Sequence, residues 1–112
     1  MVPDDPAEVA LGEFVVNLAD TGQIRYLKTD IVIAVAGKLK AEGGGKGEGE
    51  GKAPAPIRDA VISVLSSRTF SDLVKPKGRK KLKEDLIAAV NKQIKEQKAE
   101  VKEVFFNEFA MQ

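Results

Sequence analysis

The sequence predicts an α+β domain with the element order β-β-α-α-β. Segments rich in β-branched and aromatic residues stand at both ends of the chain, and two segments with helical spacing of apolar residues lie between them. The chain has 112 residues, of which 43% are hydrophobic, and this is enough for one packed core but not for two. We therefore expect one domain in which two long helices pack on a small sheet.

The first two elements are predicted to form a β-hairpin. Residues 14–18 indicate a short strand and residues 23–37 a longer one, with the turn formers Asp20, Thr21 and Gly22 between them. In the second strand, alternate positions carry apolar side chains or threonine, so this face is expected to be buried. Its members are Leu27, Thr29, Ile31, Ile33 and Val35.

The stretch that follows consists largely of glycine, glutamate and lysine, and we assign residues 38–53 as a flexible linker. Gly51 and Lys52 precede a helix, as in a phosphate-binding loop. That motif, however, needs glycine at position 46 and serine or threonine at position 53, where this chain has Lys46 and Ala53. Nucleotide binding is therefore not expected.

Two helices follow, joined by a short helical turn. The first is predicted over residues 56–67, with Pro56 in its first turn, and the second from residue 77 or 78 to about residue 97. Residues 69–74 between them form the turn, for which Thr69 is a cap candidate. Each long helix has one apolar stripe, and the stripes comprise Ile57, Ala60, Val61, Val64 and Leu65, and then Leu82, Leu86, Ala89, Val90 and Ile94.

Residues 101–112 are rich in phenylalanine and predict the last strand. Strict alternation places Phe105, Phe109 and Met111 on one face, and Val104, Phe106 and Ala110 on the other. Apolar groups on both faces predict a strand that is covered on both sides, or one whose edge is used by a partner.

Composition excludes several kinds of chemistry. The chain has no cysteine, which rules out disulfides and thiolate metal sites, and no histidine, the side chain best suited to proton transfer near neutral pH. Ser66, Ser67 and Thr69 therefore lack a histidine to activate them and are interpreted as helix-end residues. The carboxylates Asp59, Asp72, Glu84 and Asp85 are interpreted as surface charges, and no enzymatic activity, cofactor or metal is expected.

The net charge is only +1, but it is unevenly distributed. Residues 1–37 contain six acids and two bases, whereas residues 75–112 contain ten bases and six acids. The strongest basic run is Lys75, Lys77, Arg79, Lys80, Lys81 and Lys83, at the start of a predicted helix, where the helix dipole disfavours cations. Balanced net charge and the lack of interleaved aromatic residues argue against nucleic acid. A solvated face, an acidic protein partner and anionic lipid remain open.

The stretch from Pro56 to Asn91 resembles a known protein family. The sequence from Pro56 to Leu73, followed by Pro76, Gly78, Arg79, Leu82, Lys83, Leu86 and Asn91, closely resembles the periplasmic domain of FliL, the flagellar basal-body-associated protein. Residues 14–18, 26–28 and 104–109 are similar to strands of the same family. The resemblance is a distributed pattern over most of the chain, and the glycine-rich linker is not part of it.

This resemblance implies a fold similar to the stomatin/prohibitin (SPFH) domain and a function that is not enzymatic. Family members are bacterial inner-membrane proteins whose periplasmic domain forms a ring beside the flagellar stator and supports torque generation, motility and swarming. The implied partners are further copies of the chain and stator subunits of the MotA/MotB type. The implied transmembrane helix is expected upstream of this sequence, so residues 1–12 are assigned as a juxtamembrane segment and residues 13–112 as the periplasmic domain.

The candidate partner-contacting residues lie where the basic run meets the helices. They are Arg68, Phe70, Lys75, Pro76, Arg79 and Lys80. An alternative function for the basic run from Lys75 to Lys83 is a binding module for anionic lipid or an acidic partner. The apolar positions predicted to form the core are Ile57, Val61, Leu65, Leu82, Leu86, Val90, Phe105 and Phe109.

Overall fold

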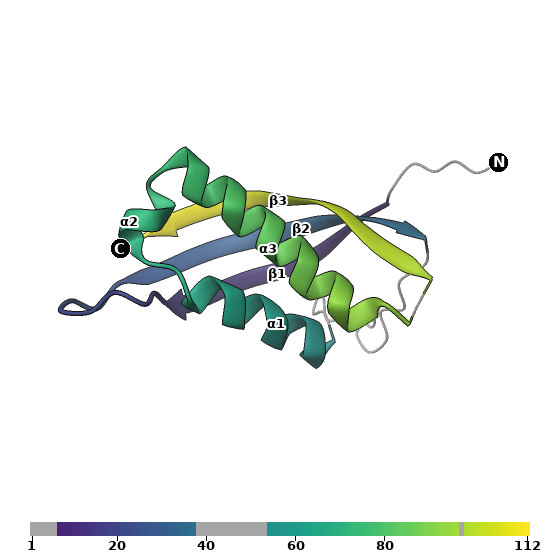
Figure 1. Ribbon diagram of the computed structural model, residues 1–112, viewed down its shortest axis with the longest axis horizontal. Coiled ribbons are helices and arrows are strands. Elements are labelled where there is room, and N and C mark those ends of the chain that lie inside the picture. Colours follow the sequence, from purple (N-terminus) through teal and green to yellow (C-terminus); the bar gives the residue numbers. More distant parts are fainter. Residues whose placement is uncertain (1–6, 38–53, 97) are drawn as a thin grey trace.

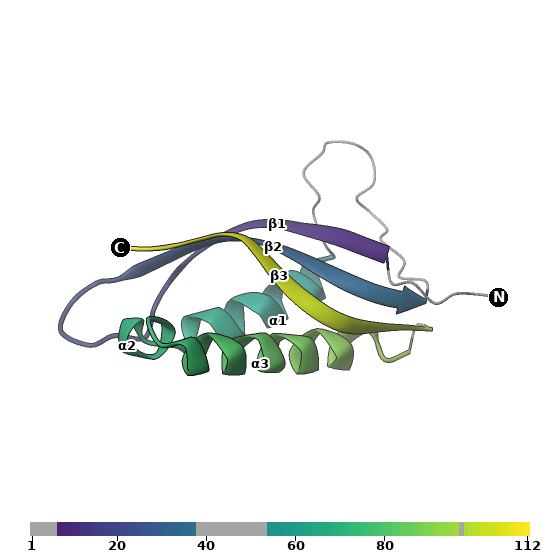
Figure 2. The same cartoon turned by 90° about the horizontal axis from the view of Figure 1, so that it is seen from above.

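A computed structural model describes residues 7–37, 54–96 and 98–112. It confirms an α+β architecture in which three helices lie on one face of a three-stranded antiparallel sheet (Figures 1 and 2). The predicted linker, residues 38–53, lies outside the described residues. In chain order the elements are β1 (Ala7–Asn17), β2 (Tyr26–Gly37), α1 (Ala55–Ser66), α2 (Phe70–Leu73), α3 (Pro76–Ile94) and β3 (Ala99–Met111).

The sheet has the strand order β1-β2-β3, so β2 is central and pairs with both neighbours. The predicted hairpin is β1–β2, but β1 begins seven residues before the predicted strand, since Ala7 pairs with Val35. The alternation predicted for β2 is confirmed, because its inward side chains, including Thr29, are all buried. The juxtamembrane assignment of residues 1–12 remains a prediction, although residues 7–12 form part of β1.

Irregularities in the edge strands decide which side chains reach the core. In β1 the register shifts between Ala10 and Gly12, where Gly12 has a positive φ of 94°, and Leu11 is turned inward with 1% exposure. Arg58 of α1 anchors this bulge, because its Nη1 donates to the carbonyl oxygen of Leu11 at 3.2 Å and its guanidinium lies 4.3 Å from the centre of the Phe14 ring. The bulge thus fixes β1 to α1.

In β3 two register shifts overturn the predicted alternation. They leave Lys102 and Asn107 as extra residues between paired positions. The inward set therefore has uneven spacing and comprises Val101, Val104, Phe106, Phe109 and Met111. Phe105, predicted to lie in the core, is 39% exposed on the opposite face. Among the described residues the strand is covered by helices on one side only, and most of its large apolar groups share that side (Figure 2). The alternative, that a partner uses an edge of this strand, remains a prediction.

The helices begin and end close to the predicted positions. Their apolar stripes are confirmed, since the three residues of α1 and the four of α3 that face the sheet are at most 2% exposed. These are Ile57, Val61, Leu65, Leu82, Leu86, Val90 and Ile94. In the part of the chain that the structure describes, no helix is long and apolar enough to cross a membrane.

Candidate interaction surface

Arg68 joins three parts of the fold. Its Nη2 donates to Asp85 of α3 at 2.6 Å, and its backbone carbonyl accepts a hydrogen bond from Ala19 in the β1–β2 loop at 2.8 Å. The Asp85 side chain also pairs with Lys81 at 3.4 Å. The hydrogen bond from Arg68 holds the pKa of the Asp85 carboxyl below its ordinary value of 3.8, because a donated hydrogen bond and a nearby cation favour the ionised form. Arg68, a predicted contact residue, therefore forms hydrogen bonds within the domain that hold its helices and the β1–β2 loop together.

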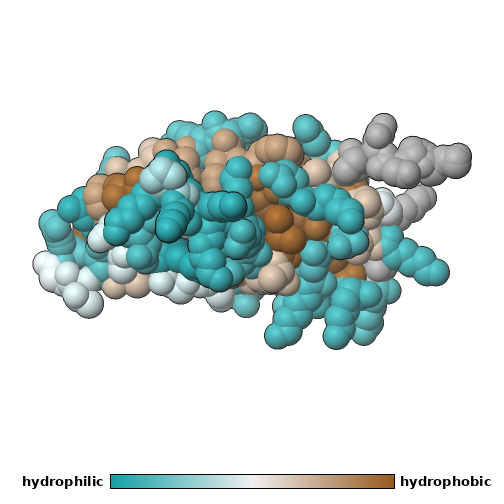
Figure 3. Space-filling view, turned by 45° about the horizontal axis from the view of Figure 1, so that its top comes forward, coloured by the Kyte–Doolittle hydropathy of each residue, from teal (hydrophilic) through white to brown (hydrophobic). Residues whose placement is uncertain are grey.

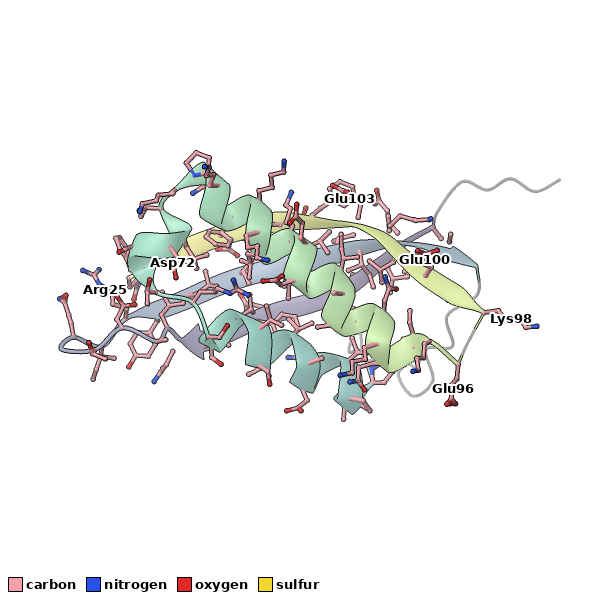
Figure 4. All side chains as sticks on the ribbon, in the orientation of Figure 1. Arg25, Asp72, Glu96, Lys98, Glu100 and Glu103 are labelled. Carbon is pink, nitrogen blue, oxygen red and sulfur yellow. The ribbon has the colours of Figure 1, made fainter. Side chains whose placement is uncertain are left out.

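Phe70 also has structural partners. Its backbone N–H donates to Oδ1 of Asp20 at 2.9 Å, and the guanidinium of Arg25 lies 4.1 Å from the centre of its ring. Arg25 and Asp72 are at the end of the molecule where α2 lies (Figure 4). The Phe70 side chain is half-buried and packs against the core. These contacts hold the tip of the β1–β2 hairpin against α2.

The short helix α2 is held at both ends. Thr69 forms the predicted N-cap: its hydroxyl accepts from the N–H of Asp72 at 3.2 Å, and its own N–H donates to the Asp72 carboxylate at 3.2 Å. The hydrogen bond from the Thr69 backbone lowers the pKa of Asp72. At the other end, Nη1 of Arg79 donates to the carbonyl oxygen of Leu73 at 2.8 Å. Arg79, a predicted contact residue, is thus a helix-terminating residue.

Gly78 allows α3 to begin immediately after α2. A Cβ built at this position would lie 1.8 Å from the carbonyl oxygen of Asp72. A side chain of any size is excluded, so the glycine is required by the close approach of two backbones. The motif Pro76–Lys77–Gly78–Arg79 therefore builds a tight helix-to-helix corner.

The remaining predicted contact residues are Lys75, Pro76 and Lys80, and all three are exposed. Pro76, Lys80 and Arg79 line one side of a groove of about 440 Å³, which Lys83, Glu103 and Phe106 complete. The ammonium group of Lys83 lies 5.5 Å from the centre of the Phe106 ring. Figure 3 faces the side where α3 meets β3 and shows hydrophobic surface bordered by hydrophilic side chains. The carboxylate that lines the groove is that of Glu103.

The face of the sheet away from the helices was not predicted as a candidate surface. It presents Phe105 and also Val15, which is 63% exposed. It also carries Glu13, Asp30 and Glu108, which the register places directly across from one another on the three strands. The sequence contains each residue, but only the strand register, with its bulges, shows that they form one row.

Comparison with known proteins decides the family. Residues 8–112 match the family described as flagellar basal body-associated protein FliL, a range that includes every helix and nearly the whole sheet. The chain belongs to the FliL family. The flagellar protein FliL of Aquifex aeolicus (strain VF5) is 34% identical to it over 99 residues, which are 88% of this chain and 56% of that protein. The chain therefore spans somewhat more than half the length of this FliL relative. FliL proteins are associated with the flagellar basal body, which confirms the resemblance stated above.

Proposed function

We propose that this chain is the periplasmic domain of a non-enzymatic accessory protein of the flagellar motor. In this proposal the domain self-associates into a ring, contacts stator subunits of the MotA/MotB type, and supports torque generation, motility and swarming. The observation that carries it is the FliL match over residues 8–112, which covers the whole core. The features left exposed support it, since they are charged and apolar surfaces suited to protein contact.

The distribution of functional groups also supports a role in binding. Arg68, Arg79 and Asp72 are engaged in hydrogen bonds that position the helices. Lys75, Lys77 and Lys80, by contrast, are exposed at the start of α3 and are available to a partner. The proposal places this end of α3 on the periplasmic side of the inner membrane, where an upstream helix would anchor the protein.

Cross-linking in native membranes tests the stator contact. The full-length protein, with a photoreactive residue at position 80, should capture a stator subunit after illumination, together with a further copy of the chain where neighbouring copies meet at this end of α3. A photoreactive residue at Lys92, towards the other end of α3, serves as the control position. Recovery of the protein without any stator subunit from every exposed position tested would reject the contact. Loss of spreading in soft agar on deletion, restored by the intact gene, tests the support of motility.

A second candidate function is binding of anionic lipid, favoured by the exposed lysines at the α3 start. In liposome flotation, Lys80→Glu with Lys81→Glu should release the domain from vesicles that contain anionic lipid. The double variant Lys92→Glu with Lys95→Glu makes the same change in charge towards the other end of α3 and should not release it. Equal flotation of wild type and both variants would reject lipid binding through this segment.

A further inference from the structure

The side of the sheet that faces away from the helices is uncovered by any element among the described residues. Figure 2 shows all three helices on one side of the sheet and none on the other. An antiparallel sheet commonly leaves one face to solvent, and that face is then usually polar with charges of mixed sign. This open face differs from that pattern in both its charge and its apolar content.

The charges on the open face form an unfavourable row. Glu13 pairs with Asp30, and Asp30 pairs with Glu108, so three carboxylates lie side by side across the three strands. Directly opposite like charges destabilise a sheet. Lys28 offsets one of them, since its Nζ lies 3.5 Å from the carboxylate of Glu13. Asp30 and Glu108 are left as adjacent negative charges, and we call the three residues the acidic row.

An apolar row lies beside the acidic row on the same face. Ala10 pairs with Val32, and Val32 pairs with Phe105, which is 39% exposed although it lies in the middle of β3. Val15 adds a second exposed apolar side chain at 63% exposure. An apolar centre bordered by charge is the usual composition of a protein-contact surface.

On the helix side of the domain, the exposed charges at the start of α3 are positive and are unfavourably placed. Lys75, Lys77 and Lys80 are exposed in and just before the first turns of α3, and that first turn contains no acidic residue. The positive end of a helix dipole disfavours cations, so these lysines destabilise the helix start. We call the three residues the basic ridge.

We infer that the open face of one copy of this domain docks on the basic ridge of a second copy. Each cluster is unfavourable alone, and each would be neutralised by the other. The acidic row is on the open face of the sheet, and the basic ridge is at the start of α3, which lies on the helix side (Figure 2). Among the described residues, no ion pair joins the two clusters within one copy. The contact uses two different surfaces and therefore repeats from copy to copy, which gives a closed ring if the rotation closes. This inference rests on the self-association in the proposed function and assigns the surfaces that make it.

Charge reversal on either surface provides the test. One variant carries Asp30→Lys and Glu108→Lys, and the other carries Lys77→Glu and Lys80→Glu. Both are expected to fold at least as stably as wild type, because the first turns the repulsive pair at positions 13 and 30 into an attractive one while positions 30 and 108 stay like-charged. The second variant places acids at a helix start. Urea unfolding of each variant verifies this. Self-association is then measured by sedimentation equilibrium at low salt and by amide chemical shifts on dilution.

We expect wild type to self-associate, with shifts concentrated at the acidic row and the basic ridge. Each variant alone should lose association by at least about tenfold, because like charges then meet across the interface. An equimolar mixture of the two variants should associate again, and so should one chain that carries all four substitutions. Lys92→Glu with Lys95→Glu, a reversal of equal size elsewhere on α3, should leave association unchanged.

Three results would overturn the inference, and they differ in what else they reject. If wild type associates and both variants associate equally well, the open face is not the contact, while self-association stands. If wild type remains monomeric both in solution and when tethered to vesicles by an N-terminal tag, self-association fails together with its surfaces. A mixture that does not recover association would also reject the pairing of these two clusters.

Discussion

The side-chain amide of Asn91 in α3 forms two hydrogen bonds with the backbone of Val101 in β3. Its Oδ1 accepts from the Val101 N–H at 2.7 Å, and its Nδ2 donates to the Val101 carbonyl at 3.3 Å. Val101 borders the register shift at Lys102. Asn91 thus satisfies backbone groups where strand pairing is irregular, and it links the helix layer to the sheet.

Replacement of Asn91 with alanine should leave both backbone groups of Val101 without their partner. We expect the free energy of unfolding to fall by about 1–3 kcal/mol. Hydrogen exchange at the Val101 amide should accelerate by more than the global loss of stability accounts for. Asn91→Asp keeps an acceptor for the N–H and should protect this amide better than alanine does. Unchanged exchange at Val101 in Asn91→Ala would contradict the role given to the amide.

The ion pair between Arg68 and Asp85 makes stability depend on pH. The pKa of Asp85 is held below its ordinary value of 3.8, chiefly by the hydrogen bond from Arg68. The stabilisation is therefore complete above pH 3.8 and is lost as the pH falls from there through the pKa of the folded state. Asp85→Asn should destabilise the domain by roughly 1–2 kcal/mol at pH 7.

Urea unfolding at pH 7 and at pH 3 measures this dependence. Wild type should lose more stability between the two values than Asp85→Asn does. Some loss should persist in Asp85→Asn, since the pKa of Asp72 is also lowered by its cap hydrogen bonds. Equal losses in wild type and Asp85→Asn would show that the pair contributes nothing to acid sensitivity.

Gly78→Ala is expected to reverse the usual sign of a glycine-to-alanine change in a helix. Alanine normally stabilises a helix interior by about 1 kcal/mol relative to glycine. Here the added Cβ would meet the Asp72 carbonyl oxygen at 1.8 Å, so α2 and α3 must move apart. We expect a net loss of about 1–3 kcal/mol. Thermal unfolding measures it, and the exposed neighbour change Lys77→Ala is the control, expected within about 0.5 kcal/mol. A stabilised Gly78→Ala would refute the close approach.

The bulge at Asn107 predicts different costs for two phenylalanines of β3. Phe109 packs against the core and contacts Phe106 with ring centres 4.9 Å apart, whereas Phe105 lies on the open face. Phe109→Ala should therefore cost about 2–4 kcal/mol. Phe105→Ala should cost less than about 1 kcal/mol. Denaturant titrations of the two variants compare them, and equal costs would mean that the strand alternates without the bulge.

The order and type of the elements could be predicted because the signals are local. The spacing of Ile57, Val61 and Leu65 reports a buried helix stripe whatever the helix packs on. The phase of β3 could not be predicted in the same way. Extra residues at Lys102 and Asn107 break a strict alternation, and nothing in the local sequence marks them.

Only part of the candidate surface could be predicted, for a related reason. The basic residues follow closely on one another in the sequence, so the pattern alone predicts Lys75 and Lys80 as candidate contact residues. Arg68 and Arg79 looked equivalent to them, but tertiary contacts with Asp85 and with the Leu73 carbonyl engage both arginines. The acidic row joins residues from three strands that are far apart in sequence, and it emerges only when the register is known.

The central position of β2 has a consequence for the time at which the domain becomes foldable during synthesis. The hairpin partner β1 is available as soon as β2 has been made, but the other edge of β2 must wait for β3, more than 60 residues later. Until then the edge of β2 that pairs with β3 has no strand beside it. The nascent chain therefore has an unpaired strand edge until the 13 residues of β3 have been made, and this edge is exposed to aggregation during that period.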